Sequence, residues 1–419
     1  MLQKTILDNG VRIVSEQLPF STVALGIWVD TGSRDELDAE SGCAHFVEHM
    51  LFKGTDRRSA VQIARELDGL GGMSNAFTSK ENTCIYATVL DSHFSRLADI
   101  LCDLFLNSTF ADEEVLRERQ VILQEISMVE DTPDDQIHDL FAGLILSGHP
   151  LGRGVLGTRE SVEALNAERL RDYVRRHYTP DRIVIAAAGN IEHRQLCDLV
   201  GAAFSRLTRR AVDQPGQRQP PSPVLPGQRV YPKPLEQVHI ITGTPGLAAI
   251  DPQRYTLHLL NTILGGNMSS RLFQEIREKH GLAYSIYSYL SPFADCGYIG
   301  VYLGVEQQSA AQALELINCE IDKLCREPVS ATELTNAKEY AKGILYLSAE
   351  NMESRMTQLA HNEFYFGRHI SIAETVAELE RVSAGDLARL AGELFGDRRF
   401  STTILGPEIT GAPVGEGNP

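Results

Sequence analysis

The stretch Ala44-His45-Phe46-Val47-Glu48-His49-Met50 is the segment around which the rest of the sequence is best understood as scaffold. On a helix, positions i, i+3 and i+4 share one face, so we expect His45, Glu48 and His49 to project together. Two imidazoles one turn apart can share a tetrahedral zinc ion. Glu48 lies too close to both for a third ligand, but it can take a proton from a water at the metal. The order His-x-x-Glu-His is the inverse of the commoner zincin motif.

Flanking residues favour a helix here, with Ser41 as the expected N-cap and Gly54 as the expected stop. The alternative is a short amphipathic helix whose two histidines are satisfied by neighbouring side chains. Because a five-residue pattern recurs by chance, the metal interpretation requires a third ligand elsewhere in the chain.

A helix predicted from about residue 112 to 130 supplies the candidate ligand, Glu125. At about 100° per residue, Glu118, Val121, Ile122, Met128 and Val129 all lie within about 60° of Glu125 on a helical wheel. Two carboxylates are therefore expected in an apolar stripe, where a metal or a cation would offset their burial. The alternative is a stripe at the rim of the helix, from which both glutamates reach water.

Composition indicates a soluble globular protein, since 43% of the 419 residues are hydrophobic and 23% are charged. The net charge of −17 (39 − 56) argues against a nucleic-acid surface. Seven scattered cysteines without CxxC spacing argue against a disulfide framework and against a thiolate zinc site. No apolar run approaches the roughly 20 residues of a membrane span, and no signal-peptide pattern opens the chain. We expect a cytoplasmic bacterial protein without a membrane partner.

The order of expected elements repeats along the chain, with strands and then helices in each half. This order predicts an α+β fold of two similar domains, each with a mostly antiparallel sheet packed by helices. The predicted boundaries are 1–210 for a zinc-binding domain, 211–228 for a linker rich in Pro, Gln and Gly, and 229–419 for the second domain. The second half lacks the motif, so one metal site per chain is expected.

Several segments together resemble the pitrilysin (inverzincin) zinc metallopeptidases. The likeness rests on His45–His49, on Glu125 placed 125 − 49 = 76 positions later, and on the stretches 118–126, 71–78 and 269–278. It covers nearly the whole chain and is closest to the two-domain branch that contains the β subunit of the mitochondrial processing peptidase and its bacterial relatives. The resemblance implies the LuxS/MPP-like metallohydrolase type of fold.

The same resemblance implies a role for each matching residue. His45, His49 and Glu125 would bind one Zn²⁺, Glu48 would be the general base, and Glu118 would orient the site. Asn75, Ala76 and Phe77 would lie on an edge strand to which an extended peptide adds. Arg277 and Tyr284 would contact the substrate and stabilise the oxyanion. The alternative for this last pair is a solvated helix arginine and a tyrosine that packs on the sheet.

These expectations combine into a zinc-dependent endopeptidase that hydrolyses peptides or precursor segments in an enclosed chamber. A closed chamber needs two such chains, so a homodimer is expected, with a heterodimer of related chains as the competing arrangement. Two other functions stay open. One is a non-catalytic scaffold or partner subunit of a processing peptidase, and the other is a narrow maturation peptidase for a cofactor precursor peptide.

Overall fold

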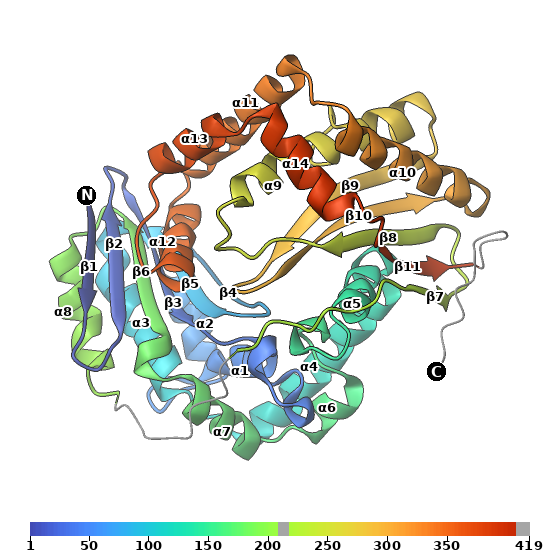
Figure 1. Cartoon of the computed structure of the whole chain (residues 1–419). Coiled ribbons are helices and arrows are strands. Elements are labelled where there is room, and N and C mark those ends of the chain that lie inside the picture. Colours follow the sequence, from blue (N-terminus) through green and yellow to red (C-terminus); the bar gives the residue numbers. More distant parts are fainter. Residues whose placement is uncertain (208–217, 408–419) are drawn as a thin grey trace. The chain divides into compact units, whose positions relative to one another are not determined.

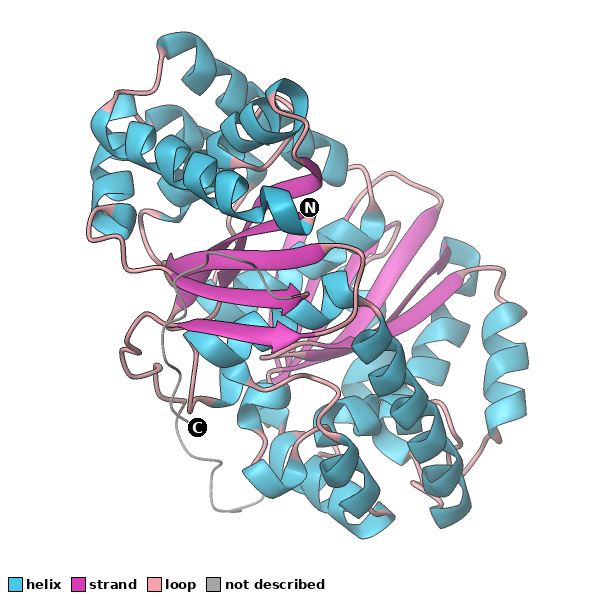
Figure 2. Cartoon of the chain, turned by 90° about the vertical axis from the view of Figure 1, so that its right-hand side faces the viewer, coloured by secondary structure: helices cyan, strands magenta, loops and turns pink. Residues whose placement is uncertain are grey.

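The computed structural model describes residues 1–207 and 218–407, and these residues pack as two units that are described separately. Each unit combines one β-sheet with helices (Figure 1, Figure 2). The first unit contains residues 1–128, 153–218 and 347–369, and the second contains 129–152, 219–346 and 370–419. The α+β class predicted from the sequence is confirmed.

The first unit is built on a six-stranded sheet in the order β1-β2-β6-β3-β5-β4. All neighbouring strands are antiparallel except β2 and β6. The central strands β3 and β6 are buried except at Thr22, the first residue of β3, as their runs of Val, Ile and Ala require. The elements are β1 (Leu2–Ile6), β2 (Arg12–Gln17), β3 (Thr22–Val29), α1 (Cys43–Leu51), α2 (Ala60–Asp68), β4 (Met73–Thr78), β5 (Thr83–Leu90), α3 (Phe94–Asn107), α4 (Asp112–Asp131), α6 (Arg159–Ala164), α7 (Ala167–His177), β6 (Ile183–Gly189), α8 (His193–Phe204) and α12 (Met352–Phe366).

The second unit is built on a five-stranded sheet in the order β7-β11-β8-β10-β9, in which only β11 and β7 are parallel. Its elements are α5 (Pro133–Ile145), β7 (Gln228–Pro232), β8 (Val238–Pro245), α9 (Arg254–Leu264), the π-helical turn η6 (Phe273–Lys279), β9 (Ala283–Pro292), β10 (Gly297–Val305), α10 (Ala310–Arg326), α11 (Ala331–Ser348), α13 (Ile372–Arg381), α14 (Ala384–Phe395) and β11 (Ser401–Gly406). Both sheets are therefore mostly antiparallel, as predicted.

Within residues 1–207 and 218–407, each sheet is covered on one face by several helices and on the other face by one helix from the opposite half of the sequence. In the first unit α12 packs on Trp28, Val184 and Ala186 through Met356 and Leu359. In the second unit α5 packs in the same way on β8, β10 and β11. The packed units consequently differ from the predicted contiguous stretches 1–210 and 229–419, because each half of the sequence lends one helix to the other sheet.

The predicted linker 211–228 falls partly outside the described residues, which resume at Arg218. Residues 219–227 contain no helix or strand, and Gln228 already begins β7. The linker and domain roles of these ranges stay predictions.

Candidate metal centre

The helix that carries the motif, α1, begins one residue later than predicted. Gly42, and not Ser41, is its N-cap, with a φ of 89° that favours glycine. A Cβ on Gly42 would also lie 2.6 Å from the Leu156 carbonyl oxygen. No side chain at the cap position satisfies the first amides. Instead the Glu36 carboxylate accepts hydrogen bonds from the N–H groups of Gly42 (3.0 Å) and Ala44 (2.8 Å).

The two faces of α1 differ as the helical spacing predicts. Phe46, Val47 and Met50 are buried against the sheet side of the unit. His45, Glu48 and His49 lie on the other face and are half-buried. Packing of the apolar face therefore fixes the direction in which the three polar side chains project.

The helix α4 brings Glu118 and Glu125 to this polar face, although its apolar stripe is rotated from the predicted one. Its buried residues are Val115, Glu118, Ile122 and Ile126. Val121 and Met128, which were expected beside Glu125, are exposed. The prediction of an apolar stripe centred on Glu125 is thus wrong, because Glu118 faces the interior while Glu125 lies at the edge of the buried face.

His45, His49 and Glu125 meet at one point. Their ligand atoms all lie within 4.8 Å of one another, and within the described parts of the chain they form the one group of this kind. Glu125 Oε2 is 3.7 Å from His45 Nε2 and 3.5 Å from His49 Nε2. These separations are long for hydrogen bonds. They are close to the roughly 3.3–3.6 Å between ligands that surround a tetrahedral zinc at about 2.0–2.2 Å, and two imidazoles with a carboxylate are a donor set that fits this metal.

Glu118 fixes the tautomer of His49. Its Oε2 is 3.0 Å from Nδ1 of the ring, so a proton on Nδ1 leaves the lone pair on Nε2, the atom nearest Glu125. The other oxygen of Glu118 pairs with Lys53 Nζ at 2.6 Å. Lys53 was not predicted as a site residue. It lies four residues after His49, as His49 lies four after His45, and this helical spacing could have indicated that the three side chains share one face.

Burial sets the protonation of the two groups that the site needs. Burial, reinforced by the charge of His49, lowers the pKa of His45 to about 3, so its imidazole is neutral and able to donate a lone pair. Burial also raises the pKa of Glu48, against the hydrogen bond that Thr78 gives it. A raised pKa moves a carboxylate towards the range in which it can both accept and return a proton.

Thr78 is a further site residue that sequence reasoning missed. Its hydroxyl donates to Glu48 Oε2 at 2.6 Å. Thr78 is the last residue of β4, and its side chain shares a strand face with Ala76. The contact could not be predicted from spacing, because Thr78 and Glu48 come from separate elements.

The strand β4 is the free edge of its sheet (Figure 1), and Thr78 at its end contacts Glu48 on the polar face of α1. Asn75 and Ala76 line a cavity of about 480 Å³ together with Glu48, His49 and Phe52. Phe77 points to the opposite face, where its ring contacts Trp28 in an edge-to-face arrangement with centroids 5.2 Å apart.

Arg277 and Tyr284 belong to the second unit, where the structure brings them together. The Arg277 guanidinium lies 5.1 Å from the centre of the Tyr284 ring and 4.7 Å from that of Phe273. Tyr284 is exposed. The pair forms an exposed cation–π contact on β9 and η6, and its catalytic role stays a prediction.

No helix in the described part of the chain has the length and apolar character needed to cross a bilayer.

Two family models of known proteins match consecutive parts of the sequence. The family model described as Insulinase (Peptidase family M16) matches residues 12–159, which include His45, Glu48, His49, Glu118 and Glu125. The model described as Peptidase M16 inactive domain matches residues 164–340.

Curated relatives are similar over almost their full length. An uncharacterized zinc protease of Streptomyces coelicolor is 42% identical over 97% of this chain and 90% of the relative. The uncharacterized zinc protease YmxG of Bacillus subtilis is 41% identical over 97% of this chain and 98% of the relative.

Solved structures share the fold at lower identity. A protease from Helicobacter pylori superposes with a TM-score of 0.89 at 20% identity, covering 97% of this chain and 99% of that one. A peptidase M16 inactive domain from Pseudomonas fluorescens superposes with a TM-score of 0.90 at 19% identity, covering 98% and 100%. Since two M16 models match consecutive parts of the sequence and relatives named zinc proteases align with it from end to end, the chain belongs to the M16 peptidase family, the pitrilysin family that its motif spacing indicates.

Proposed function

We propose that this chain is a zinc-dependent endopeptidase whose substrate lies extended along β4. The observation that carries the proposal is the meeting of His45, His49 and Glu125 beside a half-buried Glu48 whose pKa is raised. Names of the M16 relatives, which call them zinc proteases, support the same function. One zinc per chain is proposed, held by these three residues.

The residues divide the chemistry between them. A zinc ion bound by the three ligands would supply Lewis acidity towards a carbonyl oxygen and a water. Glu48 would take a proton from the attacking water and deliver it to the leaving amine. Thr78 holds Glu48 in place through its hydroxyl, and Glu118 keeps the Nε2 lone pair of His49 directed at the ligand group.

Edge-strand geometry supports extended binding of the substrate. The N–H of Ala76 donates to Asn75 Oδ1 at 2.9 Å and not to β5, so this amide faces the open side of the strand. The Asn75 oxygen occupies the position of an incoming carbonyl, which a peptide adding to β4 would replace. Asn75 and Ala76 would bind the peptide backbone, and Phe77 would support the strand from its other face.

The cavity beside Glu48 indicates what kind of substrate side chain the site would take. Its walls are largely apolar, and Lys53, Asp68 and Glu118 provide charge at its margin; the apolar lining is Phe52, Ala60, Ile63, Ala64 and Leu67. We infer that the cavity takes an apolar side chain of the substrate, because burial of apolar surface is its main source of binding energy.

Arg277 and Tyr284 are proposed to contact the substrate and to stabilise the oxyanion, the former through its guanidinium and the latter through its phenol. Their stacked arrangement and the exposure of Tyr284 support availability to a ligand. A homodimer remains the proposed assembly and a heterodimer the competing one. A cytoplasmic location likewise stays a prediction.

Replacement of the general base provides the test. Wild type and Glu48→Gln would be compared for cleavage of a panel of quenched fluorescent peptides, with bound zinc measured on both. We expect about one zinc per chain in both proteins, and a loss of about 100-fold or more in kcat for the variant.

Other outcomes would favour the other functions. Zinc bound without cleavage of any peptide by wild type would favour the scaffold or partner-subunit function. Cleavage confined to a single precursor sequence would favour the narrow maturation peptidase. Equal cleavage by wild type and Glu48→Gln would contradict the mechanism.

A further inference from the structure

The turn Ser79–Asn82 joins β4 to β5 and directly follows Thr78, the residue that holds Glu48. The turn is internally bonded, since Ser79 Oγ accepts from Asn82 N–H at 2.9 Å and Ser79 N–H donates to the Asn82 carbonyl at 2.7 Å. It also lies tightly against Gly32, where a Cβ would meet the Ser79 carbonyl oxygen at 2.3 Å. The 79–82 turn is therefore a rigid end to the strand proposed to bind substrate.

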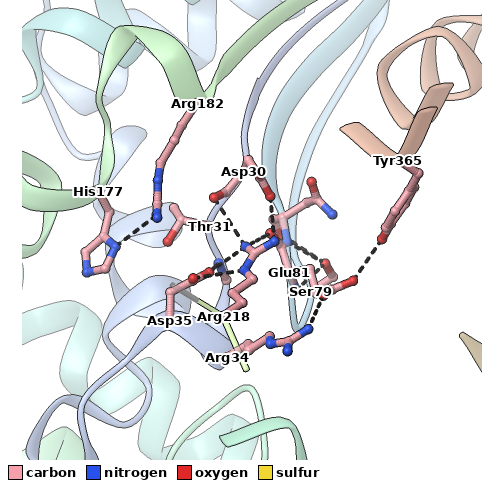
Figure 3. Close-up of polar contacts among 12 residues, drawn as sticks. Asp30, Thr31, Arg34, Asp35, Ser79, Glu81, His177, Arg182, Arg218 and Tyr365 are labelled. Atoms are coloured by element: carbon pink, nitrogen blue, oxygen red, sulfur yellow. Dashed lines mark hydrogen bonds and ion pairs between the residues drawn. The ribbon is translucent and has the colours of Figure 1, made fainter. Parts of the chain in front are cut away.

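Glu81 anchors this turn in the interior of the first unit (Figure 3). Its carboxylate accepts from Arg34 at 2.6 Å and from the Tyr365 hydroxyl at 3.0 Å. The side chains of Arg34 and Glu81 are almost completely buried. A charged pair in this setting is strongly tied to its geometry, because either charge would be costly without the other.

Arg218, the last residue of segment 153–218 of the first unit, belongs to the same network. Its guanidinium donates to both oxygens of Asp35, at 3.0 and 2.7 Å, and to Asp30 Oδ1 at 2.8 Å. It also donates to the backbone carbonyl of Glu81 at 3.0 Å. One side chain thus bridges the loop after β3 to the 79–82 turn, as Figure 3 shows.

The partners of the turn come from segments that enter or leave the first unit. Arg218 is the last residue of its segment, and the chain continues into the second unit at Gln219. Tyr365 lies on α12, in the separate segment 347–369. Lys80 donates to the carbonyl of Arg153, the first residue of the segment that Arg218 ends. Both ends of segment 153–218, together with segment 347–369, therefore converge on the four residues of the turn.

We propose that Arg218 is a positioning residue for Glu48, acting through the 79–82 turn and the hydroxyl of Thr78. The inference rests on the proposed peptidase function, in which Glu48 is the base. Arg218 itself touches neither the substrate strand nor the ligand group. It fixes the turn, the turn fixes the end of β4, and Thr78 at that end orients the Glu48 carboxylate.

Replacement of Arg218 is expected to displace the 79–82 turn away from the loop that follows β3. Asp30 and Asp35 would lose the cation that lies between them and the turn, and the Glu81 carbonyl would lose its donor. Repulsion between these carboxylates and Glu81 would then displace the turn from the β3 loop. Thr78 would move with the turn, and the Glu48 carboxylate would lose the hydrogen bond that aligns it.

The test compares Arg218→Met with Arg58→Met. Arg58 is a matched control, because its guanidinium likewise binds more than one carboxylate, those of Glu66, Asp99 and Asp103, without contact to the turn. For Arg218→Met we expect full zinc content, a KM within about twofold of wild type, and a kcat lower by roughly 10- to 100-fold, the cost of a misplacement of about 1 Å. Arg58→Met should keep the wild-type kcat.

Two additional readouts separate positioning from loss of folding. Guanidinium ion added at millimolar concentration should restore part of the kcat of Arg218→Met and have no effect on Thr78→Val. Combination of Arg218→Met with Thr78→Val should lower kcat no further than Thr78→Val alone, since both act on the same hydrogen bond. Additive losses would overturn the proposal, as would a wild-type kcat in the fully folded Arg218→Met variant.

Amide hydrogen exchange of residues 78–83 tests the structural step without catalysis. Faster exchange in Arg218→Met than in Arg58→Met is expected, and equal exchange would overturn the inference. If wild type cleaves no peptide, the proposed function fails, while the exchange measurement still decides whether Arg218 holds the turn.

Discussion

Glu36 shows how a single buried carboxylate can start the helix on which the metal site depends. It accepts from two N–H groups at the beginning of α1, where the helix dipole also favours negative charge. Burial nevertheless raises its pKa to about 8, because desolvation outweighs the hydrogen bonds from Ala44 and Gly42. The direction of α1, and with it the position of His45, relies on a group that titrates near neutral pH.

This pKa shift predicts a pH dependence of stability. In the folded protein Glu36 keeps its proton to about pH 8, whereas its ordinary pKa is 4.5. Between these values the folded state binds the extra proton, so the free energy of unfolding falls as pH rises, with a slope of at most about 1.4 kcal/mol per pH unit. Glu36→Gln has no such titration and should show a flatter profile.

Urea unfolding at pH 5, 6, 7 and 8, with zinc saturating for both proteins, measures the difference. The other titrating groups are common to both chains and cancel in the comparison. A free energy of unfolding that falls equally with pH in wild type and variant would contradict the raised pKa.

At the residue scale, the sequence predicted groups whose spacing a helix determines. His45, Glu48 and His49 share a face because α1 is a helix, and Glu125 was found through its distance from them in a known family pattern. Thr78 and Glu36 were missed because their contacts join separate elements, and no spacing in the chain encodes such a meeting. The rotation of the α4 stripe was missed for a related reason: polar Glu118 takes an interior position, which only its partners His49 and Lys53 explain.

At the scale of elements, β4 combines an exposed edge with a rigid end. A strand with an unpaired amide at its edge tends to pair with another chain. Here the Asn75 side chain satisfies the amide of Ala76, which protects the edge without a permanent partner. The strand can therefore stay open to a substrate and still resist association with other sheets.

The variant Ala76→Pro tests whether the N–H of Ala76 binds substrate, without disrupting the fold. Proline removes the N–H that faces the open side and leaves the pairing with β5 largely intact, since proline is tolerated on edge strands. We expect a near-native circular dichroism spectrum, unchanged zinc content and a loss of about tenfold or more in kcat/KM, from one missing backbone hydrogen bond in the bound peptide. Ala76→Gly, which keeps the N–H, is the control, and a similar loss in that variant would argue against backbone recognition.

The motif helix and the helix at about residues 112–130 were predicted near their observed positions, because periodicity and cap residues are local signals. The sheet that each helix covers was not predicted. The sequence reasoning left both α5 and α12 unassigned, and the apolar residues of α5 carry no information about which sheet buries them. For α12, the decisive contacts are with residues more than 160 positions away.

At the scale of the whole molecule, the interleaved segments make each half of the sequence incomplete. The only tryptophan, Trp28, lies at the contact between α12 and the first sheet, with its Nε1–H 3.3 Å from Met356 Sδ. Its fluorescence therefore reports whether α12 is in place.

A fragment of residues 1–218 lacks α12, so its first sheet is exposed on one face. We expect red-shifted Trp28 emission and aggregation of this fragment, because that face carries contiguous apolar side chains. Coexpression with residues 219–419 should restore the blue-shifted emission of the intact chain. Native-like emission from a soluble 1–218 fragment alone would show that α12 is dispensable for this sheet.

Because each sheet is covered by a helix from the opposite half of the sequence, one face of the sheet stays uncovered during part of translation. The last strand of the first sheet ends at Gly189, but α12 is complete only at Phe366, 366 − 189 = 177 residues later. At about 5–20 residues per second the ribosome needs roughly 9–35 s for that interval. During this time the nascent chain carries a finished sheet with one bare apolar face, and α5 waits even longer for strands that have not been made. Aggregation is therefore a hazard of translation more than of the completed protein, and codon usage between these two points becomes a determinant of yield.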